Sequence, residues 1–595
     1  MQPLTYPFDS EEILRKKKRL KKMLLALDVP RTTVKIAVLG GSSTQDIISI
    51  LELFLLNEGI APRFYESAYG QYWQEAMFPS EALMHFSPDI IFIHTGFRNL
   101  SELPHLQHTQ TDVDALLEKQ FSHFTTMWTR LWELYPCTII QNNFERPTYR
   151  LLGNQDIAMY QGASHFVSRL NQKFYEYKQQ HNSFFIHDLE YLSAHYGLER
   201  WNDSSAWYLY KYIMTINAIP MFAYSLSRIV KSLYGKNKKA IACDLDNTLW
   251  GGIIGEEGTT HIQLGPEFPL GQAYADFQRY LKQQKDLGVL LCLNSKNEET
   301  TAIAGLEHPD GVLRLDDFAA HRINWQRKDE NIRYLAQKLN IGEDSFVFID
   351  DNPAEREIVE QNIPSVSTPP MNNVENYIHI LDQGGYFEVT NLSTEDQDRN
   401  RMYEANRQRQ QSQEQFQDYE SYLYSLEMQA EILPFQQKDI PRITQLINKT
   451  NQFNLTTRRY SEEEVRSLYD DSTILTLAGR LKDRFGDNGL VSALIATEKN
   501  GNGQINLWVM SCRVFQRQME TAMMNACIVQ GRKLNWEYIT GIYTPNAKNQ
   551  LVQNFYKEQG FSFYKEENNQ SFWRLKISKY QEKKIPIIVN GEKYE

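Results

Sequence analysis

Short apolar runs alternate with amphipathic stretches through the first 385 residues of the chain. In the first part, the apolar runs are Val34–Leu39, Ile90–His94, Thr138–Gln141 and Phe184–His187. Strand-length apolar runs separated by helical patterns are typical of a parallel α/β domain. We therefore expect an α/β fold whose first domain, a flavodoxin-like parallel sheet, covers residues 34–233 and follows a basic leading helix at 1–33.

A second alternating region covers residues 236–385, and three of its apolar strands run directly into polar clusters. These clusters are Asp244-Leu-Asp246-Asn-Thr248, Asn294-Ser295-Lys296-Asn297 and Asp350-Asp351, with Lys328 opening a helical stretch before the last one. The carboxyl ends of parallel strands meet at one edge of a sheet, where ligands bind. We therefore expect the three clusters and Lys328 to converge.

The four carboxylates of the clusters would repel one another without a bound cation. They are Asp244, Asp246, Asp350 and Asp351. Oxygen ligands without Cys or His partners favour Mg²⁺. The alternative is an acidic loop cluster with a buried lysine ion pair.

The order of these clusters resembles the haloacid dehalogenase (HAD) superfamily of phosphotransferases. The resemblance implies that Asp244 is the nucleophile that forms an aspartyl-phosphate and that Asp246 is the general acid and base. It also implies that Ser295 hydrogen-bonds the phosphoryl oxygens and that Lys328 neutralises them.

The resemblance further implies the metal ligands and the substrate contacts. Asp244, the backbone carbonyl of Asp246, and Asp350 would hold the Mg²⁺. Thr248, Asn297 and Asp351 would bind phosphate or substrate, with Asp351 orienting Lys328 or a metal-bound water.

Three segments narrow the resemblance to the FkbH-like branch of the superfamily (subfamily IIIC). They are Leu249–Gly258, Asn294–Asn297 and Ile349–Arg356. This branch implies an enzyme that takes a small phosphorylated acyl donor, typically 1,3-bisphosphoglycerate. It removes the phosphate and loads the glyceryl unit onto the phosphopantetheine thiol of an acyl carrier protein. Fewer than thirty residues separate Trp250 from the next expected helix, so we expect a Rossmann-like parallel sheet with a minimal cap.

Relatives in this branch often have Cys directly before the Ser-Lys-Asn segment, where this chain has Asn294. The nearest thiol, Cys292, lies two residues upstream and shares a strand face with that position. It is either a relocated thioester relay or a small core residue whose burial raises its pKa. We expect burial.

The first domain opens with Leu39-Gly-Gly-Ser-Ser-Thr44, which resembles the first block of SGNH-type esterases with Ser42 at the nucleophile position. Gly41 replaces the Asp of that block, and Asp203-Ser-Ser-Ala206 lacks the His of the Asp-x-x-His block. His187 beside Asp188 does not have the expected spacing. A Ser nucleophile needs a positioned base, so we expect a non-hydrolytic docking domain, with an active esterase as the alternative.

A polar stretch at 386–426 predicts an exposed connecting helix. The segments that follow include Asn451–Thr457, Gly489–Thr497, Leu507–Cys512, Met519–Gly531 and Asn554–Phe561. Through them, residues 427–578 resemble a GNAT-like acyltransferase domain with a mixed sheet. Residues 579–595 form an expected tail. The pyrophosphate loop of working acyltransferases carries two glycines, which are Gln516 and Gln518 here. We therefore do not expect coenzyme A to bind in the usual mode. A carrier-protein pantetheine site and a packing scaffold remain open.

The composition of the chain restricts which partners it could bind and in which cellular compartment it is expected. Lys and Arg number 63 against 74 Asp and Glu, a net charge of −11, without a basic tract for nucleic acid. The five cysteines are dispersed, no apolar run reaches membrane-spanning length, and no signal peptide is expected. We expect a cytoplasmic enzyme with a small phosphorylated acyl substrate and an acyl carrier protein as partners. A plain HAD phosphatase and a non-catalytic assembly platform are the alternatives.

Overall fold

The computed structural model describes residues 2–392, 399–413, 415–546, 548–590 and 592–593. The chain forms two compact units. The first consists of Met1–Tyr234 and Tyr460–Asp470, and the second of Gly235–Arg459 and Asp471–Glu595.

The first unit is built on a parallel sheet with strand order β2-β1-β3-β4-β5. Its strands are β1 (Thr32–Gly40), β2 (Ile60–Glu66), β3 (Ile90–His94), β4 (Thr138–Asn142) and β5 (Phe184–His187). Its longer helices are α1 (Ser10–Ala26), α2 (Gln45–Asn57), α5 (Gln110–Leu134), α6 (Ala163–Gln180) and α10 (Ile219–Leu233). Its shorter helices are α3 (Tyr72–Met77), α4 (Glu81–Phe86), α7 (Leu189–Tyr196), α8 (Leu198–Trp201) and α9 (Ser204–Tyr210).

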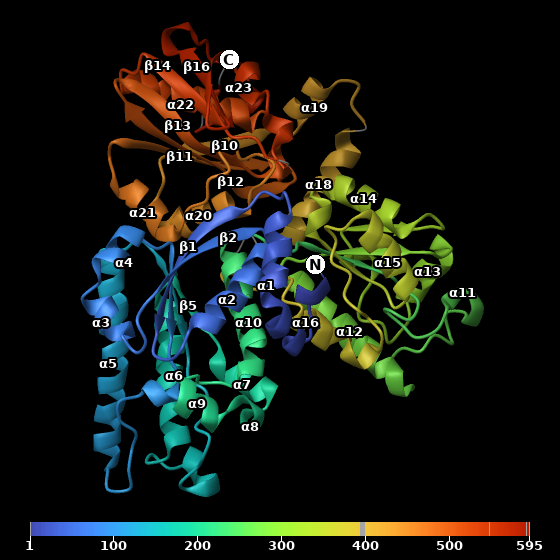
Figure 1. The fold of residues 1–595 in the computed structure, drawn as a ribbon. Coiled ribbons are helices and arrows are strands. Elements are labelled where there is room, and N and C mark those ends of the chain that lie inside the picture. Colours follow the sequence, from blue (N-terminus) through green and yellow to red (C-terminus); the bar gives the residue numbers. More distant parts are fainter. Residues whose placement is uncertain (1, 393–398, 414, 547, 591, 594–595) are drawn as a thin grey trace. The chain divides into compact units, whose positions relative to one another are not determined.

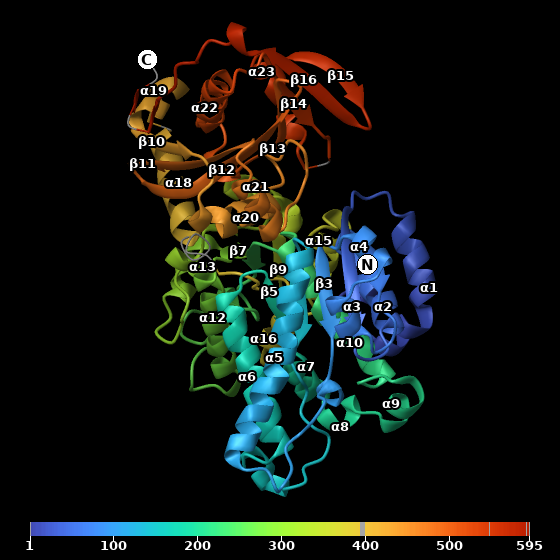
Figure 2. The same ribbon diagram turned by 90° about the vertical axis from the view of Figure 1, so that its left-hand side faces the viewer.

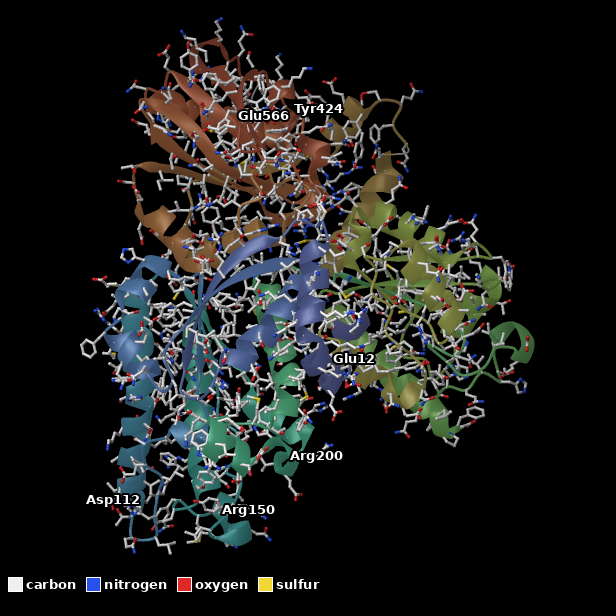
Figure 3. All side chains as sticks on the ribbon, viewed as in Figure 1. Glu12, Asp112, Arg150, Arg200, Tyr424 and Glu566 are labelled. Atoms are coloured by element: carbon white, nitrogen blue, oxygen red, sulfur yellow. The ribbon has the colours of Figure 1, made fainter. Side chains whose placement is uncertain are left out.

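Helices cover both faces of this sheet (Figure 1). One core joins the sheet to α1, α2 and α10, and a second joins it to α5 and α6 around Trp128. Helix α5 starts with a capping box in which the side chains of Thr109 and Asp112 accept from each other's backbone N–H groups; Asp112 is labelled in Figure 3. Both faces are therefore buried, as a parallel sheet requires.

Helix α21 (Glu462–Asp470) belongs to this first unit, although the sequence places it inside the expected domain at 427–578. The Ser183 hydroxyl donates to Glu463, 3.1 Å away, and the Ser461 hydroxyl donates to the carbonyl of Pro136 at 3.4 Å. The first unit thus includes a segment distant in sequence.

The second unit contains a four-stranded parallel sheet with strand order β8-β7-β6-β9. Its strands are β6 (Ala240–Cys243), β7 (Leu290–Ser295), β8 (Ala320–Ile323) and β9 (Phe346–Ile349). Its helices are α11 (Ile254–Glu257), α12 (Pro269–Asp286), α13 (Glu299–Leu306), α14 (Lys328–Leu339), α15 (Pro353–Asn362) and α16 (Tyr377–Gln383). Between β6 and α12, α11 is the single α-helix, so little chain is available for a cap.

The same unit contains a mixed sheet with strand order β15-β16-β14-β13-β12-β11-β10-β17-β18. Its strands are β10 (Met428–Leu433), β11 (Ile474–Asp483), β12 (Gly486–Lys499), β13 (Asn502–Met510), β14 (Tyr538–Tyr543), β15 (Ser562–Glu567), β16 (Gln570–Lys576), β17 (Ile587–Val589) and β18 (Glu592–Lys593). The associated helices are α18 (Arg399–Gln413), α19 (Tyr419–Ser425), α20 (Ile440–Lys449), α22 (Met519–Lys533) and α23 (Phe555–Glu558). Helices α22 and α20 lie on opposite faces of the sheet (Figure 2). The expected α/β class, with two parallel sheets and one mixed sheet, is confirmed.

Two expected segments differ from the sequence prediction. The stretch at 386–426 contains α18 and α19 rather than one exposed helix, and Met402, Ala405 and Arg409 of α18 are buried. Residues 393–398 and 414 of that stretch lie outside the described residues. The expected tail contributes β17, which pairs in parallel with β10 because its apolar side chains complete the core. Within the described residues, we find no helix with the length and apolarity needed to cross a membrane.

We expect Ile587→Ala to lower the free energy of unfolding by about 2–5 kcal/mol, because trimming a buried Ile leaves a cavity. Ile587 is 2% exposed and belongs to the core of the mixed sheet. The matched control is Ile588→Ala, since that neighbouring side chain is only half-buried. Denaturant unfolding followed by intrinsic fluorescence checks both variants. Equal losses in the two would show that β17 is not part of the core.

Candidate functional site

The candidate site lies at the carboxyl ends of β6, β7 and β9. Cys243, the last residue of β6, pairs with Leu293 on one side and Ile349 on the other. The Asp244 backbone N–H donates to the carbonyl of Ile349 at 2.9 Å, which extends the pairing by one step. This register places Asp244 beside Asp350, the residue after β9.

The Lys328 ammonium lies between two carboxylates. Its Nζ is 2.8 Å from Asp244 and 2.7 Å from Asp350. The Lys328 and Asp350 side chains are 2% and 0% exposed, and Asp244 is 13% exposed. Burial opposes the charge on Lys328, but the two carboxylates outweigh it and raise the pKa of the ammonium. Lys328 is therefore charged at neutral pH and holds both strand ends together.

A third carboxylate completes an oxygen cluster. Ligand oxygens of Asp244, Asp350 and Asp351 all lie within 4.8 Å of one another. Burial and the charge of Asp244 raise the pKa of Asp350 to about 6 and also raise the pKa of Asp351. Crowded carboxylates with raised pKa values are suited to a hard divalent cation, which would relieve their repulsion.

The Asp246 carboxylate faces a different set of donors. Its Oδ1 accepts from the Trp250 indole N–H at 2.9 Å and from the Ile254 backbone N–H at 3.1 Å. Its Oδ2 accepts from the Asn297 amide at 2.9 Å. Three donors fix this carboxylate in one orientation beside the cluster.

The remaining expected residues surround the same point. The Asn297 amide also reaches the Ser295 hydroxyl at 3.3 Å, which brings β7 into the site. The Thr248 hydroxyl accepts from the Asp351 backbone N–H at 3.3 Å. All of the residues singled out from the sequence for this centre therefore lie at one edge of the sheet.

Sequence reasoning missed the residues that position Lys328. The Asn294 amide donates to the carbonyl of Lys328 at 2.9 Å, and Asn331 donates to the Asn294 side-chain carbonyl at 3.1 Å. Asn294 thus fixes the start of α14 against β7. Its position directly before Ser295 could have indicated this role from the sequence.

Arg356 was also missed as a positioning residue. Its guanidinium donates to the backbone carbonyls of Asp350 at 2.5 Å and Asp351 at 2.8 Å. These bonds hold the loop that carries both carboxylates. The residue stands at the end of the Ile349–Arg356 segment, so its proximity in sequence could have indicated this role.

The thiol of Cys292 lies in the core on the α14 side of the sheet. Its burial is complete and raises its pKa to about 12. The expected burial is confirmed. A neutral thiol without solvent access is a poor nucleophile.

Ser42 of the first unit is 1% exposed, and its hydroxyl has no hydrogen-bond partner within the described part of the chain. Asp203, the residue that would start the Asp-x-x-His block, caps α9 by accepting from the Ala206 backbone N–H. Neither ring nitrogen of the buried His187 has a described partner, and Asp188 caps α7. No described hydrogen bond connects a base to Ser42.

No curated protein matches the chain. Two acetyltransferase structures match the C-terminal part: a ribosomal-protein-alanine N-acetyltransferase from Escherichia coli and the spermidine N-acetyltransferase from Vibrio cholerae. They are 13% and 17% identical, cover 26% and 25% of this chain and 97% of their own, and each has a TM-score of 0.21. At these TM-scores neither likeness bears on the chemistry of the chain.

Two further matches cover larger parts of the chain. A crystal structure of the N-terminal part of a Bacteroides fragilis protein, containing a phosphatase domain complexed with Mg, is 29% identical to this chain. It covers 63% of this chain and 99% of its own, with a TM-score of 0.58. The family model for the FkbH N-terminal domain matches residues 35–231, roughly a third of the chain. Residues 35–231 are therefore similar to the FkbH N-terminal domain.

Proposed function

We propose that the chain is a magnesium-dependent phosphatase of the HAD type with Asp244 as its nucleophile. The observation that carries the proposal is the buried Lys328 ammonium, which bridges Asp244 and Asp350 at the carboxyl ends of adjacent strands. The match to a phosphatase domain of Bacteroides fragilis that was complexed with Mg supports it.

Nucleophilic attack and proton transfer are carried out by different residues. Asp244 attacks the phosphorus atom and carries the phosphoryl group as an aspartyl-phosphate until water releases it. Asp246, fixed by Trp250 and Asn297, gives a proton to the leaving group and then takes one from the attacking water. Ser295 donates to a phosphoryl oxygen, and Lys328 neutralises the charge that gathers there.

Magnesium fits the donor set of the site. Asp244 and Asp350 would supply carboxylate oxygens and the backbone carbonyl of Asp246 a neutral one, while the Asp351 carboxylate lies within 4.8 Å of the other two and would orient a metal-bound water. Bound Mg²⁺ would neutralise the carboxylates and the phosphoryl oxygens so that an anionic nucleophile can approach.

We further propose that the free energy released when an acyl phosphate is cleaved drives the loading of an acyl carrier protein. In 1,3-bisphosphoglycerate, attack of a carrier thiolate on the acyl carbon would form a thioester and expel one phosphate. Asp244 would take the second phosphoryl group, from the monoester. The FkbH N-terminal domain and the small cap support this reading, since a carrier-bound group needs an open crevice.

A plain phosphatase is the second candidate. Asn294 stands where relatives have Cys, and its amide is used to hold Lys328. Cys292 is buried with a raised pKa. These two observations favour phosphate release without a thioester on the enzyme.

Asp244→Asn should reduce phosphate release by roughly 10⁴-fold or more, because the amide keeps the shape but loses the attacking charge. Phosphate released from 1,3-bisphosphoglycerate above the enzyme-free background is the measurement. Ser42→Ala is the control, and we expect unchanged release because Ser42 has no described base. Turnover by Asp244→Asn comparable to the parent would show that this centre is not the catalyst.

Removal of the cation should stop the reaction without unfolding the chain. We expect EDTA to bring phosphate release to background and excess Mg²⁺ to restore it. Asp351→Asn should act more mildly than Asp244→Asn and should raise the Mg²⁺ concentration needed for half-maximal rate. A Mg²⁺ titration of both proteins checks this, and full activity in EDTA would contradict the proposal.

The Cys292→Ser variant tests whether carrier loading passes through a thioester on the enzyme. The experiment incubates the full-length protein with Mg²⁺, 1,3-bisphosphoglycerate and a holo carrier protein. Intact-protein mass spectrometry then measures the masses of both proteins. We expect a glyceryl adduct on the carrier with both parent and Cys292→Ser, since a buried thiol takes no part. An adduct on Cys292 itself, with loading lost in the variant, would reverse this prediction. Phosphate release without any carrier adduct would favour the second candidate function, a plain phosphatase.

A further inference from the structure

A loop of the first unit carries a glutamate and two histidines at intervals of three residues. They are Glu102, His105 and His108, and the loop lies between η2 (Phe97–Asn99) and α5. One possible ligand atom from each of these three residues lies within 4.8 Å of the other two. The function proposed above uses none of them, because the phosphatase centre belongs to the second unit.

The three side chains are directed toward one another. The two imidazole rings lie with their centroids 3.7 Å apart, and the Nε2 atom of His105 is 4.0 Å from a carboxylate oxygen of Glu102. The backbone N–H of His105 donates to Nδ1 of His108 at 3.4 Å, which requires that ring nitrogen to carry no proton. A neutral imidazole is the form that binds a metal ion. The Glu102 and His105 side chains are 41% and 56% exposed, so an ion can reach the cluster from solvent.

Hydrogen bonds hold the backbone on both sides of the cluster. The Gln120 amide of α5 donates to the Ser101 hydroxyl at 2.6 Å, and the Gln161 amide donates to the carbonyl of His108 at 3.4 Å. Within the loop, the backbone N–H of His108 donates to the carbonyl of His105 at 2.9 Å. Because the backbone is already fixed, little further conformational entropy is lost when an ion orders the side chains.

The charges around the cluster act on a cation in opposite directions. Hydrogen bonds from Thr109 and the nearby charge of His108 lower the pKa of Asp112, which is labelled in Figure 3. A second carboxylate therefore lies close to the cluster. Lys119 lies 3.7 Å from the other carboxylate oxygen of Glu102 and competes with a cation for it. Its side chain is 70% exposed, so solvent screens its charge.

We infer that Glu102, His105 and His108 form a binding site for a transition-metal cation of the Zn²⁺ type, separate from the magnesium centre. Two imidazole nitrogens and a carboxylate oxygen are a zinc ligand set, and water would take the fourth tetrahedral position. Rotation of these surface side chains would bring each donor to the roughly 2.0–2.2 Å that zinc bonds require. Mg²⁺ prefers oxygen ligands, so the nitrogen donors separate the two sites chemically. The bound ion would cross-link the loop that leads from β3 into α5.

Isothermal titration calorimetry of the full-length protein tests this site, with ZnCl₂ as the probe and excess Mg²⁺ present to occupy the phosphatase centre. We expect Zn²⁺ to bind the parent protein. His105→Gln and His108→Gln should each weaken binding by about 10–100-fold or more, since even a partner behind a metal ligand has an effect of that size. Lys119→Gln should strengthen binding by a few-fold, because it removes a positive charge beside Glu102.

The matched control is His85→Gln. His85 is another exposed histidine of the first unit, but its Nδ1 atom bonds to the carbonyl of Glu81 at 2.7 Å, and we expect the affinity for Zn²⁺ to stay unchanged. The melting temperature in EDTA checks that every variant folds, and added Zn²⁺ should raise it in the parent but not in His105→Gln.

Two results would overturn the inference. One is failure of Zn²⁺ to bind the parent, or equal affinity in the parent and in both histidine variants. The other is loss of Zn²⁺ binding in Asp244→Asn with the histidine variants unaffected, which would place the ion in the phosphatase centre.

Discussion

The Lys328 ammonium is the interaction on which the candidate centre depends. Asp244, Asp350 and Asp351 are crowded at one edge of the sheet, and their mutual repulsion would separate the strand ends. A buried cation between two of them offsets that repulsion before any metal binds. Removing one partner from such a buried ion pair costs about 3–5 kcal/mol. The charge that would serve the reaction therefore also maintains the geometry of the site.

Helix α14 runs from this centre to a cavity of about 190 Å³ in the same unit. The helix starts at Lys328, where Asn294 fixes its first carbonyl, and Lys338 and Leu339 near its end line the cavity. Twelve helical residues span about 18 Å. Lys328 and Lys338 thus lie near the two ends of one helix.

The sequence predicted the centre well because its residues follow apolar strands in a fixed order. Asp244, Ser295 and Asp350 each come at a strand end, so their convergence depends only on a parallel sheet. The amide contacts between Asn294 and Asn331 depend on how α14 packs against β7, which no local pattern records. The cavity was not predicted because Arg409 and Arg517 lie more than a hundred residues apart. Strand β17 was missed because three residues are too few for a clear alternation.

The position of α21 in the first unit limits where the gene can be divided without dividing a folded unit. Residues 460–470 belong to the first unit, while the chain on both sides of them belongs to the second. The polypeptide therefore passes between the units three times. A gene segment that ends at residue 234 would leave Ser183 and Pro136 without the partners that Glu463 and Ser461 provide. Residues 35–231, which match the FkbH N-terminal domain model, are thus only part of the folded unit that contains them. Recombination after residue 234 would separate residues 460–470 from the rest of the first unit, whereas all segments of the second unit would stay on one piece.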